Sequence, residues 1–218
     1  LEAQEKQTRK AAEVLSKARR AAAEELQRRI VAELRGLSMP SVRFAVEFTP
    51  IENDCGFDRS GCDQIRFTMS ANAGEELGRI SRIASGGELS RIMLAMKNVF
   101  AENDPVQTMI FDEIDTGVSG VAAQRVGEKL FQVSLGKQVM CVTHLPQIAA
   151  MADSHYVIKK EERSGRTYTD VLPLDKEGRL RELARLHGGD NITELTLASA
   201  AEQIENAVKF KETVKKRP

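Results

Sequence analysis

The sequence predicts an α/β protein with a mostly parallel sheet, flanking helices and a long helix at its start. Residues 1–37 contain no proline and are rich in alanine, glutamate and arginine, which favours a helix. Alternating apolar and polar residues at 42–48 and 64–69 predict an antiparallel pair of strands with one solvated face. From 106 to 151, short apolar runs alternate with helical segments, a pattern typical of parallel strands covered on both faces.

The first predicted element is one helix with a narrow apolar stripe, because aliphatic residues recur there at intervals of three or four. Strict heptads are not sustained, so the pattern fits a coiled-coil arm or a helix packed on its own domain. We expect the charged residues before Ala11 to project from the domain. The predicted division is a helical stub at 1–37 and a globular part at 38–218. The chain starts inside the helical pattern, which suggests a piece of a longer protein.

The remaining predicted elements follow in order along the chain. A helix at 86–101 comes after a glycine-punctuated loop, and strands at 106–111 and 138–142 enclose a second helix. The later elements are a helix opening at 146–151, a hairpin of 156–159 with 167–172, and helices at 177–187 and 193–210, the last with Thr193 and Thr196 in its N-cap region.

Composition excludes several classes of protein. The hydrophobic fraction of 41% and the charged fraction of 29% describe an ordinary globular chain, and 32 basic residues balance 32 acidic ones. Global charge therefore gives no argument for or against nucleic acid. The three cysteines have no zinc-type spacing, which indicates reduced thiols of a cytosolic protein. No run approaches the ~18 apolar residues of a membrane span, so we expect no membrane partner.

The segment Ser85-Gly86-Gly87-Glu88 is the first candidate site. A glycine pair at the start of a helix exposes backbone amides to a phosphate, and the positive end of the helix dipole faces the same ligand. The Ser85 hydroxyl adds a donor. The competing interpretation is an ordinary capping box, with Ser85 as N-cap and Glu88 at the third helical position.

The second candidate site lies where two apolar strands end. Asp112 and Glu113 follow the first strand, at the edge of a parallel sheet where ligands bind. One carboxylate suits Mg²⁺, and the other can orient or deprotonate a water molecule. His144 follows the second strand and can bond a terminal phosphate or the attacking water. The alternatives are a solvated acidic turn and a structural histidine.

Two further patterns need a decision. Asp115-Thr116-Gly117 also occurs in aspartic proteases, but such an enzyme needs two aspartates that share a proton, and only one copy is present. The protease therefore stays a remote alternative, and we expect Asp115 in a loop that meets a partner subunit. The run 135–138 ends like a phosphate loop, but Gln138 replaces the required Ser or Thr and Phe131 replaces the first glycine. It is a turn.

The motifs in 83–91, 111–120 and 142–149, and the ending at 186–194, resemble the RecN family of bacterial ATPases. That family repairs DNA double-strand breaks and is related to the SMC proteins and the ABC-type ATPases. The resemblance runs from 43 to 202. It implies that the globular part is the C-terminal lobe of an ABC-type head, and that residues 1–37 are the returning arm of a coiled coil.

The resemblance also implies roles for single residues. Ser85, Gly86, Gly87 and Glu88 match the signature motif, which contacts the γ-phosphate of ATP held by the opposite subunit. Asp112 matches the Walker B aspartate near Mg²⁺, Glu113 the residue that activates water, Asp115 the D-loop and His144 the switch histidine. The family's Walker A lysine and Q-loop belong to an N-terminal lobe that these 218 residues do not contain. We therefore expect ATPase activity in the full-length protein and none in this chain alone.

The expected cofactors are ATP and Mg²⁺. The expected partners are DNA, by resemblance only, a second copy of the ATPase head, and the protein's own N-terminal Walker A lobe, in the bacterial cytoplasm at the nucleoid. The alternative from another class is a non-enzymatic coiled-coil tether or dimerisation module. A phosphate loop encoded upstream in the parent gene favours the ATPase, and its absence favours the tether.

Overall fold

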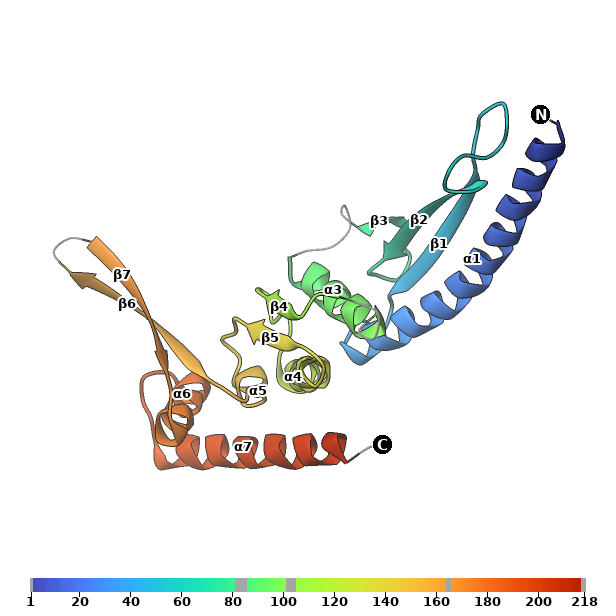
Figure 1. The fold of residues 1–218 in the computed structure, drawn as a ribbon. Coiled ribbons are helices and arrows are strands. Elements are labelled where there is room, and N and C mark those ends of the chain that lie inside the picture. The colour runs from blue at the N-terminus through green and yellow to red at the C-terminus, as the bar shows by residue number, and fades with distance from the viewer. Residues whose placement is uncertain (1, 81–85, 101–104, 164–165, 217–218) are drawn as a thin grey trace. The chain divides into compact units, whose positions relative to one another are not determined.

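The structure is a computed structural model that describes residues 2–80, 86–100, 105–163 and 166–216 (Figure 1). The chain divides into two compact units, Leu1–Asn103 and Asp104–Pro218, and each is described by itself. The predicted α/β class is confirmed, with a parallel strand pair, flanking helices and a long first helix. No helix in the described ranges has both the length and the apolar character that crossing a membrane needs.

Unit 1 combines the long helix with a small antiparallel sheet and a second helix. The strand order is β1-β2-β3, and β1 pairs with β2 from Arg43↔Ser70 to Pro50↔Asp63. The predicted antiparallel pair is therefore confirmed, and a two-residue third strand extends it. The elements are α1 (Glu2–Gly36), β1 (Arg43–Pro50), β2 (Asp63–Ser70), β3 (Gly78–Arg79) and α3 (Gly86–Phe100).

The second half of α1 belongs to the core of unit 1. Ile30 and Leu34 are fully buried one turn apart, because the aliphatic stripe faces α3. On α3, Ile92 and Leu94 are fully buried. The guanidinium of Arg29 donates to the carbonyl oxygen of Val99 at 3.2 Å, in the last turn of α3. The long helix is thus joined to the helix that the glycine pair opens.

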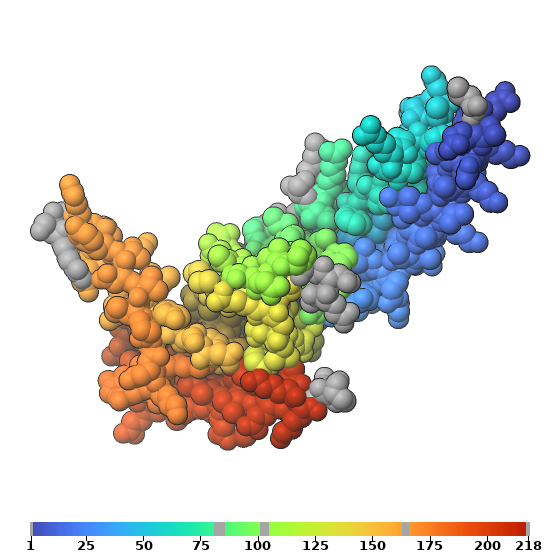
Figure 2. Space-filling view, in the orientation of Figure 1, coloured from blue at the N-terminus to red at the C-terminus, as the bar shows by residue number. Residues whose placement is uncertain are grey.

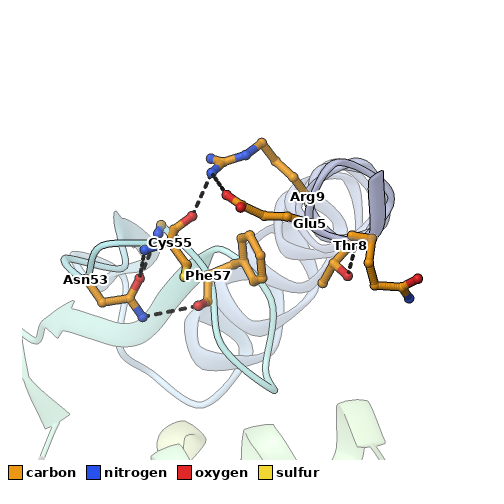
Figure 3. A network of polar contacts seen from close by, with 8 residues as sticks. Glu5, Thr8, Arg9, Asn53, Cys55 and Phe57 are labelled. Atoms are coloured by element: carbon orange, nitrogen blue, oxygen red, sulfur yellow. Dashed lines mark hydrogen bonds and ion pairs between the residues drawn. The ribbon is translucent and has the colours of Figure 1, made fainter. Parts of the chain in front are cut away.

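The first half of α1 lies along the β1–β2 hairpin and its connecting loop, as the blue and cyan atoms in Figure 2 show. Arg9 Nη2 donates to the carbonyl oxygen of Cys55 at 2.9 Å, and its guanidinium lies 5.5 Å from the centre of the Phe57 ring (Figure 3). Asn53 Oδ1 accepts from the amides of Cys55 and Gly56, which shapes this loop. The expected projection before Ala11 is therefore wrong at Arg9, because its long side chain reaches the loop.

One edge of the small sheet is covered by a side chain of α1. Gln27 Oε1 accepts from the backbone amide of Val46 in β1 at 2.7 Å. Nearer the start of α1, Arg20 donates to Asp63 of β2 at 3.1 Å and lies 4.5 Å from the centre of the Phe48 ring. An unpaired strand edge is a template for association with other chains, and the bond from Val46 to Gln27 occupies one backbone donor of the β1 edge.

Unit 2 contains the predicted strand–helix–strand crossover, a long hairpin and two helices. Strands β4 and β5 are parallel, from Thr108↔Gln138 to Phe111↔Cys141. The hairpin is longer than predicted and extends away from α6 and α7 (Figure 2). The elements are β4 (Thr108–Phe111), α4 (Gly120–Ser134), β5 (Gln138–Cys141), α5 (Pro146–Ala149), β6 (Tyr156–Arg163), β7 (Arg166–Pro173), α6 (Lys176–Gly188) and α7 (Glu194–Lys215).

Helices α5, α6 and α7 pack around one hydrophobic cluster of unit 2. Leu183 is fully buried in a cluster with alanines of α6 and α7 and with Met151. The predicted N-cap region of α7 is confirmed as a capping box, in which Thr193 and Thr196 exchange hydrogen bonds. Gly127 of α4 permits a close approach to α5, since a Cβ there would lie 3.1 Å from the carbonyl oxygen of Gln147.

The β4–β5 pair has one buried and one exposed face. Met109 and Phe111 are buried, whereas Ile110 and Met140, which are neighbours in register, are 69% and 53% exposed. Among the residues that the structure describes, the expected cover on both faces is therefore found on one face only. Because side chains alternate along a strand, an apolar run of this length places large apolar residues on both sides.

Candidate functional site

The glycine pair opens α3, as predicted. Gly86 and Gly87 are the first residues of this 15-residue helix, and Glu88 lies in its first turn. The first amides of a helix have no acceptor within the helix, and its N-terminus carries a partial positive charge. This end of α3 can therefore bind an anion. Ser85, and with it the capping-box alternative, lies outside the described residues.

The acidic pair lies at the end of β4 and points away from the core of unit 2. Asp112 and Glu113 are both exposed, and the amide of Glu113 donates to Asp112 Oδ1 at 3.0 Å. The φ angle of Glu113 is 58°, in the left-handed region that residues with a Cβ rarely adopt. A second bond, from the amide of Thr116 to the carbonyl oxygen of Glu113 at 3.1 Å, closes a tight turn.

This turn separates two pairs of neighbouring residues. Ile114 is fully buried and Asp115 is 5% exposed, whereas Asp112 and Glu113 remain at the surface. The left-handed conformation at Glu113 reverses the chain between the two pairs. Strained backbone of this kind costs on the order of 1–3 kcal/mol and occurs mainly at functional sites. The burial of Ile114 offsets part of that cost.

Asp115 joins the loop after β4 to the loop after β5. Its Oδ2 accepts from Thr143 Oγ1 at 2.7 Å and from the backbone amide of His144 at 2.9 Å. The ring nitrogen Nδ1 of His144 lies 3.0 Å from the same oxygen. The His144 side chain is nevertheless 74% exposed. The ring is therefore held through Nδ1, and Nε2 lies on its solvent side.

Cys141 is a half-buried cysteine at the end of β5. Burial, with Asp115 and Asp112 nearby, raises the pKa of its thiol to about 12. A protonated thiol is a poor nucleophile and a poor metal ligand. The expectation of reduced thiols agrees with this position, and Cys55, Cys62 and Cys141 are all free cysteines.

The donor set of the acidic pair fits Mg²⁺. Mg²⁺ prefers oxygen ligands and is held in nucleotide sites by one or two carboxylates, together with phosphate oxygens and water. The exposed carboxylates of Asp112 and Glu113 offer such oxygens. Within the described ranges, no group of three or more His, Cys, Asp or Glu side chains could hold a metal ion without a further ligand.

The structure brings together part of the predicted set of site residues. Asp112, Glu113, Asp115 and His144 lie in two joined loops of unit 2, whereas Gly86, Gly87 and Glu88 lie in unit 1. In the described part of the chain, Asp115 bonds to Thr143 and His144 and not to a second carboxylate, which argues against the protease alternative. The sequence analysis gave no role to Thr143, whose hydroxyl bonds to Asp115. A hydroxyl residue directly before His144 was the sequence feature that could have indicated this contact.

Comparison with solved structures identifies the class of fold. A crystal structure of an Smc head domain with a coiled coil and joint from Pyrococcus yayanosii matches with a TM-score of 0.51 and 23% identity. The match covers 75% of this chain and 29% of that chain. The chain thus has the fold of part of an SMC head domain. No protein-family model matches the sequence.

Comparison with curated proteins finds DNA repair proteins. The chain is 43% identical over 211 residues to the DNA repair protein RecN of Bacillus subtilis, a match covering 91% of this chain and 37% of that protein. It is 44% identical over 195 residues to RecN of Treponema pallidum, a match that covers 88% of this chain and 34% of that protein. Over about nine tenths of its length the chain is thus similar to RecN proteins. It spans about a third of the length of the curated relatives it matches.

Proposed function

We propose that this chain is the C-terminal part of an SMC-like ATPase that acts in DNA double-strand-break repair. In the full-length protein it supplies the hydrolytic half of an ATP site. The observation that carries the proposal is the outward carboxylate pair after β4, beside a histidine that the buried Asp115 orients. Phosphoryl transfer depends mainly on positioning and charge neutralisation, which such a group of residues provides.

Each residue has one task in this proposal. Asp112 holds Mg²⁺, which neutralises charge on the phosphates when bound. Glu113 orients the attacking water and accepts its proton. His144 presents Nε2 to the terminal phosphate or the water. At the junction with a second head, the nucleotide is contacted by the signature residues Ser85, Gly86, Gly87 and Glu88, the glycines through their amides. The loop containing Asp115 meets the second head across the nucleotide.

The site is completed by other parts of the protein. Ile110, Met140 and Val142 form an exposed apolar face on the β4–β5 pair. Contiguous apolar surface of this kind usually marks an interface. It supports a docking surface for the protein's own N-terminal lobe, which would bring the Walker A lysine. Without that lobe the phosphates have neither a cradle of amides nor the lysine, so the 218 residues alone do not turn over ATP.

The wider cycle follows from the family. Two heads close on ATP and open on hydrolysis, and the coiled-coil arm to which α1 belongs carries this motion to DNA ends. Support for DNA comes from the relatives, which are DNA repair proteins. The net charge of zero adds none. We place the protein in the bacterial cytoplasm, at the nucleoid.

The test is phosphate release by the full-length protein with and without Glu113→Gln. The variant keeps the size of the side chain and removes the base, so the rate falls by about 100-fold or more while ATP is still bound. Glu202→Gln, a matched change at an exposed position of α7, leaves the rate unchanged. Steady release by the isolated 218-residue chain, abolished by Glu113→Gln, would overturn the proposed division of the site.

A further inference from the structure

The carboxylate of Asp115 is buried, although the sequence suggested contact with a nucleotide across an interface. Asp115 is 5% exposed, and its Oδ2 accepts hydrogen bonds from the Thr143 hydroxyl and the His144 amide and lies 3.0 Å from Nδ1 of His144. Asp115 and the residues that contact its carboxylate, Thr143 and His144, all belong to unit 2. The side chain therefore acts inside its own head, and any contact with a partner falls to the exposed neighbours Thr116 and Gly117.

The hydrogen-bond pattern defines which ring nitrogen of His144 carries hydrogen. Asp115 Oδ2 accepts from the amide of His144, which can only donate, at 2.9 Å and from Thr143 Oγ1 at 2.7 Å. Thr143 Oγ1 in turn accepts from the amide of Leu145 at 3.1 Å, which leaves its hydrogen for Asp115. Nδ1 of His144 lies 3.0 Å from this acceptor oxygen, which favours the form of the ring with hydrogen on Nδ1. In the neutral ring Nε2 is then the acceptor.

We propose that Asp115 is a positioning residue that fixes the tautomer and direction of His144. This inference rests on the proposed ATPase function. The arrangement has the logic of a Ser-His-Asp site, where a buried aspartate holds the histidine in one tautomer without reacting itself. It also links the turn at Glu113 to His144, because Asp115 lies two residues after Glu113 and binds the other loop. The water-orienting carboxylate and the histidine are held as one unit.

The test is a double-mutant cycle on kcat for Mg·ATP hydrolysis by the full-length protein. Asp115→Asn lowers kcat about 10- to 100-fold, the range typical of partners that orient an active-site group, with the KM for ATP little changed. In a His144→Ala background, the same substitution changes kcat by less than about twofold, because its effect passes through the histidine. A purely structural role would instead multiply the two effects, and that result would overturn the inference.

Two controls separate orientation from folding. Asp153→Asn removes another aspartate of unit 2, which bonds to Lys211 at 2.7 Å, and leaves kcat unchanged. Should Asp115→Asn reduce the amount of folded protein, Thr143→Val removes one donor from the same oxygen and lowers kcat, while Thr143→Ser restores it. Equal rates for Thr143→Val and Thr143→Ser contradict the inference.

Failure of this inference is distinct from failure of the proposed function. An active full-length protein that needs Glu113 but is indifferent to His144→Ala leaves the ATPase in place and overturns the role of Asp115. A full-length protein that releases no phosphate under any condition, with intact folding, removes the proposed function itself.

Discussion

The loop after β4 and the helix pair α6–α7 use their residues in opposite ways. The loop exposes two carboxylates and holds Glu113 at a φ of 58°. The helix pair buries Leu183 completely, begins α7 with a capping box and begins α6 with Asp175 accepting from the amide of Gly178 at 2.7 Å. The loop therefore loses stability in order to present its carboxylates, whereas the helix pair contributes stability and carries no predicted site residue.

The largest expected effect comes from Glu113→Gly. Glycine adopts positive φ freely, so about 1–2 kcal/mol of strain is relieved, against about 0.5–1 kcal/mol of added unfolded-state entropy. The free energy of unfolding therefore stays equal or rises by up to about 1.5 kcal/mol, while phosphate release by the full-length protein falls about 100-fold or more. Urea unfolding and a phosphate assay measure the two quantities.

The matched control is Ser38→Gly, at the other described non-glycine residue with positive φ, 63°. It should give the same gain in stability with no change in rate. A clear loss of stability in Glu113→Gly would show that the turn is not strained.

The second effect tests the helix pair. Leu183→Ala removes a fully buried side chain from the α6–α7 cluster and lowers the free energy of unfolding by about 2–5 kcal/mol. Leu195→Ala in α7, where the leucine is 79% exposed, changes it by less than about 0.5 kcal/mol. Denaturant unfolding measures both, and phosphate release per folded molecule stays normal. Equal costs for the two leucines would mean that the cluster is not the stabilising core.

The smallest effect concerns pH at the base of the site. Because the pKa of Cys141 is raised to about 12 from the usual 9.0, its contribution to stability is complete below pH 9 and decreases as pH rises toward 12. Unfolding measured between pH 8 and about 10.5 should lose stability more steeply in the wild-type protein than in Cys141→Ala. At pH 8, a thiol reagent should modify the exposed Cys55 and spare Cys141. Rapid modification of Cys141 in the folded protein contradicts its burial.

Local rules predicted the scaffold of the site. The apolar runs ending at Phe111 and Val142 indicated parallel strands, and parallel strands end at one edge of a sheet, so the meeting of the loop after β4 with the loop after β5 followed. The N-cap of α7 was likewise predictable, because Thr193 and Thr196, three residues apart, form it. Such features depend on neighbours in sequence.

The inward turn of Asp115 was not predictable in the same way. It depends on the left-handed conformation of Glu113, and no glycine or asparagine at that position signals it. The hairpin β6–β7 exceeded its prediction because backbone pairing continues through the charged residues after Lys159, where no alternation of apolar and polar residues signals a strand. The contact of Arg9 with Cys55 spans 46 residues, beyond the reach of any local pattern.

The shared oxygen of Asp115 has a consequence for the divergence of related sequences. A lineage that replaces His144 leaves two remaining donors around Asp115 and weakens selection for an acid at position 115. A lineage that first loses the acid leaves the imidazole free to rotate. Changes at positions 115 and 144 should therefore occur together across relatives.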